Sequence, residues 1–153
     1  MLNNNSEEIK NSIYRFNEML KTNFVYFFDV KEFQNISEYY LSTGEIQLSK
    51  KALSMGLSQH PNNLDLLLIK IEHLILDKRF TSAKKILNNL DLISPSNEEV
   101  FIQRASIESK LGNHLESINF LIKLLDFTEE PTDVWNLIGM EYLLLEDYYN
   151  AEY

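Results

Sequence analysis

The sequence repeats itself with a period of 34 residues. Similar residues recur at this step in three series, and Pro61 and Pro95 are also 34 residues apart. The series are Phe33, Leu67, Phe101 and Trp135; Ile46, Phe80, His114 and Tyr148; and the small residues Ser49, Ala83, Ser117 and Ala151. A fixed period of this length is typical of stacked repeats, which present an extended surface to a partner. The period therefore favours a binding function over catalysis.

The composition narrows the class of protein further. The chain has 153 residues, enough for one domain with a sizeable core, and its 4 glycines and 3 prolines favour helices over hairpins. The absence of cysteine excludes disulfides and thiolate zinc sites. A net charge of −9 disfavours binding to nucleic acid, because the chain repels phosphates. With neither a signal peptide nor a long apolar span in the sequence, we expect a cytoplasmic protein that does not enter a membrane.

Each repeat has the pattern of two helices. In the first, Asp29 and Glu32 form a capping box, and Gly44 ends the helix in a left-handed conformation. Pro61 ends the second helix. The residues predicted to point inward are Phe33, Ile36, Ser37 and Tyr40 on the first helix, and Ile46, Leu53 and Leu57 on the second.

The later repeats follow in register, so we expect breaks near residues 44, 61, 78, 95, 112 and 130. Lys78 and Arg79 replace the glycine turn, and Ser96 with Glu99 makes a second capping box. Pro131 suits the first turn of the next helix. The fourth repeat should bury Trp135, Ile138, Gly139 and Tyr142, and then begin a second helix that carries Tyr148 and Ala151.

The chain stops at Tyr153, about seven residues into that second helix. From this we expect an N-terminal part of a longer repeat protein, with an apolar face exposed around Ile138, Tyr142 and Leu145. The segment before the repeats should form a helix over residues 7–22. An aromatic cluster follows it: Phe24, Tyr26, Phe27 and Phe28. The cluster either ties down a capping helix, which solenoid ends require, or forms a docking patch for a partner.

The segment from Trp135 through Gly139 to Tyr142, with Ala151 nine residues later, resembles the tetratricopeptide repeat (TPR) family, including its bacterial members. The resemblance covers residues 30 to 153. It implies an all-α, right-handed superhelical solenoid of antiparallel helix pairs, with about three and a half repeats. We expect a capping helix and linker over residues 1–29, repeats at 30–63, 64–97 and 98–131, and an incomplete repeat at 132–153. Earlier copies depart from the family pattern, with Lys70 and Arg104 at usually apolar positions and Glu108 in place of the tyrosine.

The resemblance also implies a peptide-binding groove on the concave face, lined by the first helices. Carried over to this sequence, the groove residues are Lys31, Gln34 and Glu38; Asp65, Leu68 and Glu72; Glu99, Ile102 and Ser106; Asp133, Asn136 and Met140. Carboxylates stand where a chaperone-tail binder would need cations, so we expect a basic or apolar peptide. Acids in the first turn are also favoured by the helix dipole alone, which explains Asp65, Glu99 and Asp133 without any partner.

Signals for catalysis or metal binding are missing from the sequence. His60, His73 and His114 do not stand at ligand spacing, and His114 belongs to a core series. The pairs Lys50–Lys51 and Lys84–Lys85 fit a solvated outer face. We therefore expect a protein-binding scaffold that is not an enzyme and has no cofactor. Two alternatives remain: a self-association module, including a homodimer formed through the open C-terminal end, or the regulatory part of a larger protein active beyond residue 153.

Overall fold

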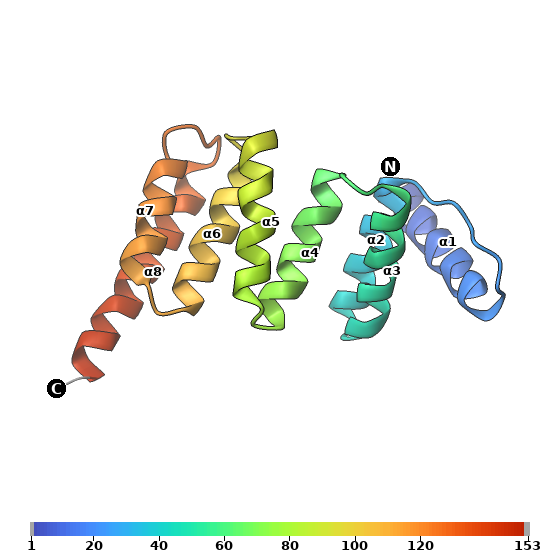
Figure 1. The fold of residues 1–153 in the computed structure, drawn as a ribbon, viewed down its shortest axis with the longest axis horizontal. Coiled ribbons are helices and arrows are strands. Elements are labelled where there is room, and N and C mark those ends of the chain that lie inside the picture. The colour runs from blue at the N-terminus through green and yellow to red at the C-terminus, as the bar shows by residue number, and fades with distance from the viewer. Residues whose placement is uncertain (1, 152–153) are drawn as a thin grey trace. The chain divides into compact units, whose positions relative to one another are not determined.

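The computed structural model describes the backbone of residues 2–151 and the side chains of residues 5–146. Over that backbone the chain forms eight α-helices and no strand, as expected (Figure 1). The helices are α1 Leu2–Lys21, α2 Val30–Ser42, α3 Ile46–Gln59, α4 Leu64–Leu76, α5 Phe80–Ile93, α6 Glu98–Lys110, α7 His114–Leu124 and α8 Pro131–Ala151. They divide into two compact units, Met1–His73 and Leu74–Tyr153. In the first unit α1 packs on α2 and α2 on α3, and in the second unit α5 packs on α6, α6 on α7 and α7 on α8.

All six predicted breaks are confirmed as helix boundaries, and three of them share one turn geometry. Gly44 and Gly112 have φ of 80°, and Lys78, midway between them in the 34-residue series, has φ of 58°. A residue in this left-handed region lets the chain reverse directly after a helix. The capping box of Asp29 and Glu32 is also confirmed. The predicted box at Ser96 is wrong, because α6 begins one residue later and the Asn97 side chain accepts from Val100 N at 3.1 Å.

Replacing Lys78 with glycine should stabilise the protein. A side chain with a Cβ in the left-handed region costs about 1–2 kcal/mol, and the greater freedom of glycine in the unfolded chain offsets part of the gain. We expect a net increase in the free energy of unfolding of roughly 0.5–1 kcal/mol, measured by urea denaturation. Lys78→Ala removes the same charge but keeps the Cβ, so it should bring no such gain; an equal gain would assign the effect to charge.

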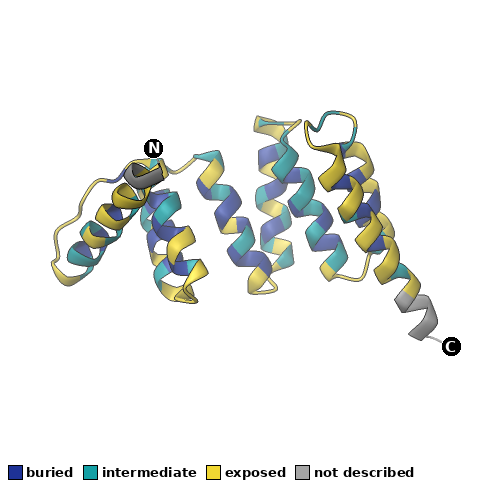
Figure 2. Cartoon of the chain, turned by 180° about the vertical axis from the view of Figure 1, so that it is seen from behind, coloured by how far each residue is buried: buried dark blue, intermediate teal, exposed yellow. Residues whose placement is uncertain are grey.

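The first unit is built around an aromatic core. Phe33 is fully buried, with its ring centroid 5.3 Å from that of Phe28. The buried cluster comprises Phe16, Met19, Phe28, Phe33, Ile36, Tyr40, Ala52, Leu53, Leu66 and Ile69. As Figure 2 shows, buried residues gather on the sides of the helices that face each other. The predicted inward face of α2 is confirmed in full, whereas Ile46, at the first position of α3, is 41% exposed.

Small polar residues join α2 to α3 inside this core. The hydroxyl of Ser49 donates to the backbone carbonyl of Ser37 at 2.7 Å, and the two hydroxyls are 2.9 Å apart. Both serines are completely buried. Small side chains allow the helix axes to approach closely, as the sequence pattern predicted, and the hydrogen bonds satisfy the buried hydroxyls.

The α1 helix packs on α2 through charged and polar contacts as well as Phe16. Arg15 Nη1 lies 2.7 Å from Glu32 Oε1, and Ser12 Oγ donates to the same oxygen at 3.2 Å. Tyr40 OH donates to Asn17 Oδ1 at 2.7 Å. Glu32 therefore has two roles, since it completes the cap of α2 and also binds α1.

Hydrogen bonds to its backbone hold the aromatic segment between α1 and α2 in place. Gln59 of α3 donates to the carbonyl of Tyr26 and accepts from the amide of Phe28. Of the four predicted cluster members only Phe28 is buried, and Phe24 and Phe27 are about two-thirds exposed or more. The expectation that these rings tie down α1 by packing is wrong for three of the four, because hydrogen bonds from Gln59 and Arg15 fix the segment instead.

The second unit accommodates the departures from the TPR pattern with ion pairs. Arg104 binds Asp91 of α5 and donates to Asn88 Oδ1 at 2.9 Å, and it also lies over the ring of Phe120. Glu108 is buried and pairs with Lys84. Lys84 is therefore not merely a solvated outer lysine, because it compensates the carboxylate of Glu108.

Glu108 should make stability depend on pH. Burial is the largest influence and raises the pKa of this carboxyl, but hydrogen bonds from Lys84 and Asn113, with the charges of Lys84 and Arg104, outweigh it and lower the pKa below the ordinary 4.5. A lowered folded-state pKa stabilises the fold above the unfolded value and ceases to do so as the pH falls through the folded value. Glu108→Gln should therefore be less stable than wild type at pH 7, with the difference shrinking below pH ~4.5 in thermal melts. A gap unchanged at pH 3 would contradict the ionised pair.

The last helix differs from the prediction. The chain continues as one helix, α8, from Pro131 to Ala151. A second helix does not start near residue 146, because Glu146 occupies the turn position and follows three leucines, which are strong helix formers. Without a paired helix, Trp135 is 59% exposed and the predicted buried tryptophan is wrong.

Two further predictions for α8, the packing role of Gly139 and the exposed apolar face, also differ from the structure. Nothing lies within 4 Å of the Cβ position of Gly139, so its small size does not serve a close helix contact. Of the predicted exposed face, Tyr142 is exposed and Leu145 is half-buried, but Ile138 is buried against α7. Tyr148 and Ala151 lie outside the residues whose side chains are described. None of the described helices is both long enough and apolar enough to cross a membrane.

Candidate functional site

The predicted groove residues of the first unit lie on α2 and α4. Lys31, Glu38 and Asp65 are exposed, Gln34 and Glu72 are half-buried, and Leu68 is buried. Two of the three exposed side chains are carboxylates. They stand at the start of α4 and two turns along α2, so the helix dipole can explain Asp65 but not Glu38.

In the second unit the predicted residues lie on α6 and α8. Asp133, Asn136 and Met140 are exposed, and Glu99, Ile102 and Ser106 are half-buried. Glu99 accepts a hydrogen bond from Gln103 Nε2 at 2.7 Å, so it has a structural partner on its own helix. That the four triplets together line one groove stays a prediction.

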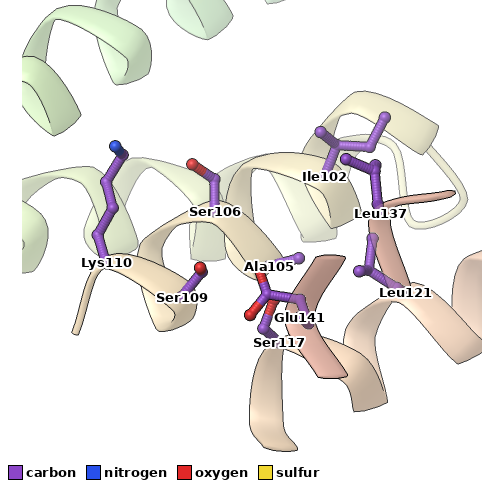
Figure 3. A pocket seen from close by; sticks show the side chains of 9 residues that line it. All are labelled: Ile102, Ala105, Ser106, Ser109, Lys110, Ser117, Leu121, Leu137 and Glu141. Carbon is purple, nitrogen blue, oxygen red and sulfur yellow. The ribbon is translucent and has the colours of Figure 1, made fainter. Parts of the chain in front are cut away.

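A cavity of about 270 Å³ lies between α6, α7 and α8 in the second unit (Figure 3). We call it the Glu141 pocket, and its lining residues are Ile102, Ala105, Ser106, Ser109, Lys110, Ser117, Leu121, Leu137 and Glu141. Its two ends differ in chemistry. Ile102, Leu121 and Leu137 gather at one end, and Glu141 and Ser117 lie next to each other away from them. The pocket thus pairs an apolar wall with a carboxylate.

The Glu141 carboxylate is oriented from α7. His114 Nδ1 lies 2.9 Å from Glu141 Oε2, and both side chains are almost buried. His114 is therefore more than the packed aromatic that the series predicted, because it connects the first residue of α7 to α8. Ser117, one turn along α7, is 1% exposed, and its hydroxyl has no hydrogen-bond partner among the described residues.

The structure brings only Ile102 and Ser106 of the predicted groove residues into this pocket. On α6 the predicted set ended at Ser106. The next turn of the helix carries Ser109 and Lys110, which also line the pocket. On α8 the pocket uses Leu137 and Glu141, each one position after a predicted residue. That rotation depends on how α8 packs on α7, and no sequence pattern indicates it.

The other histidines have structural roles. His60 Nε2 lies 2.9 Å from the carbonyl of Phe28, and His73 Nε2 lies 3.0 Å from Ser49 Oγ in the buried serine network. Among the described residues, no group of three His, Asp or Glu side chains is placed to hold a metal ion. The predicted groove residues and the Glu141 pocket therefore offer a partner charge, hydrogen bonds and apolar contacts.

Comparison with known proteins gives structural neighbours only. No family model and no curated protein sequence matches the chain. Two crystal forms of MamA AMB-1 are similar to it, both at 18% sequence identity. The match to the first has a TM-score of 0.62 and covers 94% of this chain and 90% of the MamA chain. The match to the second has a TM-score of 0.58 and covers 95% of this chain and 91% of the MamA chain. MamA is a TPR-like helical solenoid, so the likeness shows that this chain has the same fold.

Proposed function

We propose that this chain is a protein-interaction scaffold that binds a basic or apolar peptide segment of another protein along its first helices. The observation that carries the proposal is the exposure of the carboxylates Glu38, Asp65 and Asp133 on α2, α4 and α8. Lys31 is the one lysine among the predicted groove residues, and the whole chain has a net charge of −9. Complementary charge steers association and selects partners.

The proposal includes a cytoplasmic location, no catalytic role and no cofactor. The TPR-like fold supports it, because stacked helical repeats provide surfaces for partners rather than reaction centres. The Glu141 pocket supports it too, since a small cavity with mixed lining can receive one side chain of a bound peptide.

A peptide array probed with the full chain tests this function. Basic peptides should bind and should weaken as salt rises, because charges are screened over about 8 Å at physiological ionic strength. Glu38→Lys removes an attraction and adds a repulsion, each up to about 1 kcal/mol, so we expect a loss of roughly tenfold at low salt. Glu116→Lys makes the same charge change on α7, a second helix, and should have little effect. A preference for acidic peptides would overturn the proposal.

Self-association is the second candidate function. Trp135 and Tyr142 are exposed on α8, and the space around Gly139 between them is open. A second copy of the chain could cover this face. Light scattering over a range of concentrations would then show a dimer, and Trp135→Glu would abolish it. A monomer at all concentrations would remove this alternative.

A further inference from the structure

We propose that the Glu141 pocket receives a single lysine or arginine side chain of a protein partner. The inference rests on the proposed function and specifies one contact within it. The aliphatic stem would lie along Ile102, Leu121 and Leu137, and the cationic head would meet Glu141 and Ser117. Both parts of the pocket are needed, because these side chains combine an apolar stem with a charged tip.

Glu141 provides an oriented negative charge. One carboxylate oxygen, Oε2, is bound by His114 at 2.9 Å, and among the described residues Oε1 has no hydrogen-bond partner. The residue is only 9% exposed, so folding has already removed most water from the carboxylate. A cation that enters therefore pays little further for desolvating its partner, and the pair interacts in a weakly screened environment.

Ser117 provides the second, independent indication. Its hydroxyl is buried and unpartnered, although buried polar groups in folded proteins are nearly always hydrogen-bonded. Figure 3 places this side chain beside Glu141 at the same end of the pocket. An ammonium or guanidinium group has only donors, and it can satisfy the lone pairs of both oxygens at once.

The pocket's own lysine does not fill this place. Lys110 lies at the edge of the pocket, and its side chain points away from Glu141 (Figure 3). The described residues include no ion pair between the two. The Lys110 ammonium instead repels an incoming cation, so Lys110→Gln should strengthen binding.

Disulfide tethering tests the inference with defined probes, because the chain has no native cysteine. Ser106→Cys or Ser109→Cys places one thiol on the pocket wall, and Asn119→Cys on the exposed side of α7 is the control. Asn119 has Glu116 three residues before it and Lys123 four after, so its local charge is balanced. Each variant is equilibrated under mildly reducing conditions with amino-, methyl- and carboxyl-terminated alkanethiols of two to four carbons. Mass spectrometry then measures the mixed disulfides.

Relative to the control site, the amino-terminated thiols should be favoured over methyl-terminated ones on the order of tenfold, the size of one charge-assisted hydrogen bond. Glu141→Gln should remove the preference, Ser117→Ala should reduce it, and Lys110→Gln should increase it. Circular dichroism verifies that each variant is folded, and the comparison of probes on a pocket that retains Glu141 does not depend on the Glu141 variant.

If the amino-terminated and methyl-terminated thiols are captured equally, the pocket is merely apolar. If the carboxyl-terminated thiols are preferred, the pocket is an anion site at Lys110. Either result overturns the inference. If the array finds basic peptides whose binding is unchanged by Glu141→Gln, the proposed function stands and this contact fails. If tethering succeeds but no peptide binds, the pocket stands and the scaffold function fails.

Discussion

Replacing Phe33 with alanine is expected to lower the free energy of unfolding by about 3–5 kcal/mol, the usual range for a buried phenylalanine. The ring is fully buried and packs between Phe28 and His60, with centroid distances of 5.3 and 6.2 Å. These neighbours come from the segment before α2 and from the end of α3, so the cavity cannot close by moving one side chain. Urea denaturation followed by circular dichroism measures the loss.

Trp135→Ala is the matched control for this prediction. Trp135 occupies the same position in the 34-residue series and is larger, but it is 59% exposed. Its removal should change stability by no more than about 0.5 kcal/mol, as for other surface substitutions. If Trp135→Ala costs as much as Phe33→Ala, then Trp135 is buried in solution, which would contradict the prediction.

Hydrogen exchange should show that the effect of Phe33→Ala is local. Each compact unit has its own buried cluster, around Phe33 in the first and around Leu121 in the second. Repeat arrays lose stability mainly in the altered repeat and its neighbours. Protection should therefore fall most within residues 5–73. An equal loss in residues 74–146 would mean that the two units unfold as one.

The period of the sequence was enough to predict the six breaks between helices from residue 44 to residue 130, but not the unbroken course of α8. Helix breaks depend on local signals, such as Gly44, Pro61 and Gly112, that act within one turn of the chain. Lys78 was placed at a turn because it stands 34 residues from both Gly44 and Gly112, and it adopts the same left-handed conformation as these glycines. The inward face of α2 followed from the same periodicity.

The predictions that failed depended on a partner helix. Trp135 and Gly139 match the TPR pattern, but residues of that pattern are buried only when a second helix folds back over them. Here α8 runs straight on, so the motif is present without its packing. The Glu141 pocket was missed for a related reason. Its residues come from three helices, and one position of rotation decides whether Met140 or Glu141 faces inward.

Of the four glycines, Gly56 should tolerate added volume least. A Cβ at this position would lie 3.0 Å from Phe33 Cγ, 3.1 Å from Phe33 Cβ and 3.2 Å from Leu66 Cδ1. The Leu66 methyl can move, but the Phe33 atoms lie next to the backbone of α2 and cannot. Gly56→Leu should therefore lower the free energy of unfolding by about 3 kcal/mol or more, at the upper end for overpacked cores.

Gly139→Ala is the control that measures the ordinary effect of replacing a helical glycine, without the crowding found at Gly56. Replacing a helical glycine with alanine gains about 0.8–1 kcal/mol when the new methyl meets nothing. Gly139→Ala should show that gain, because its Cβ position is open. Gly56→Ala has the same helical gain but also the contact with Phe33, so its net effect should be smaller or negative.

Combining Gly56→Leu with Phe33→Ala tests the contact directly. Phe33→Ala removes the Cγ atom of Phe33 but leaves its Cβ atom, so it relieves only part of the crowding. The double variant should therefore lose less free energy of unfolding than the sum of the two single losses, by about 0.5–3 kcal/mol. Strict additivity would show that the two residues do not touch, and that α2 and α3 pack differently from the arrangement described above.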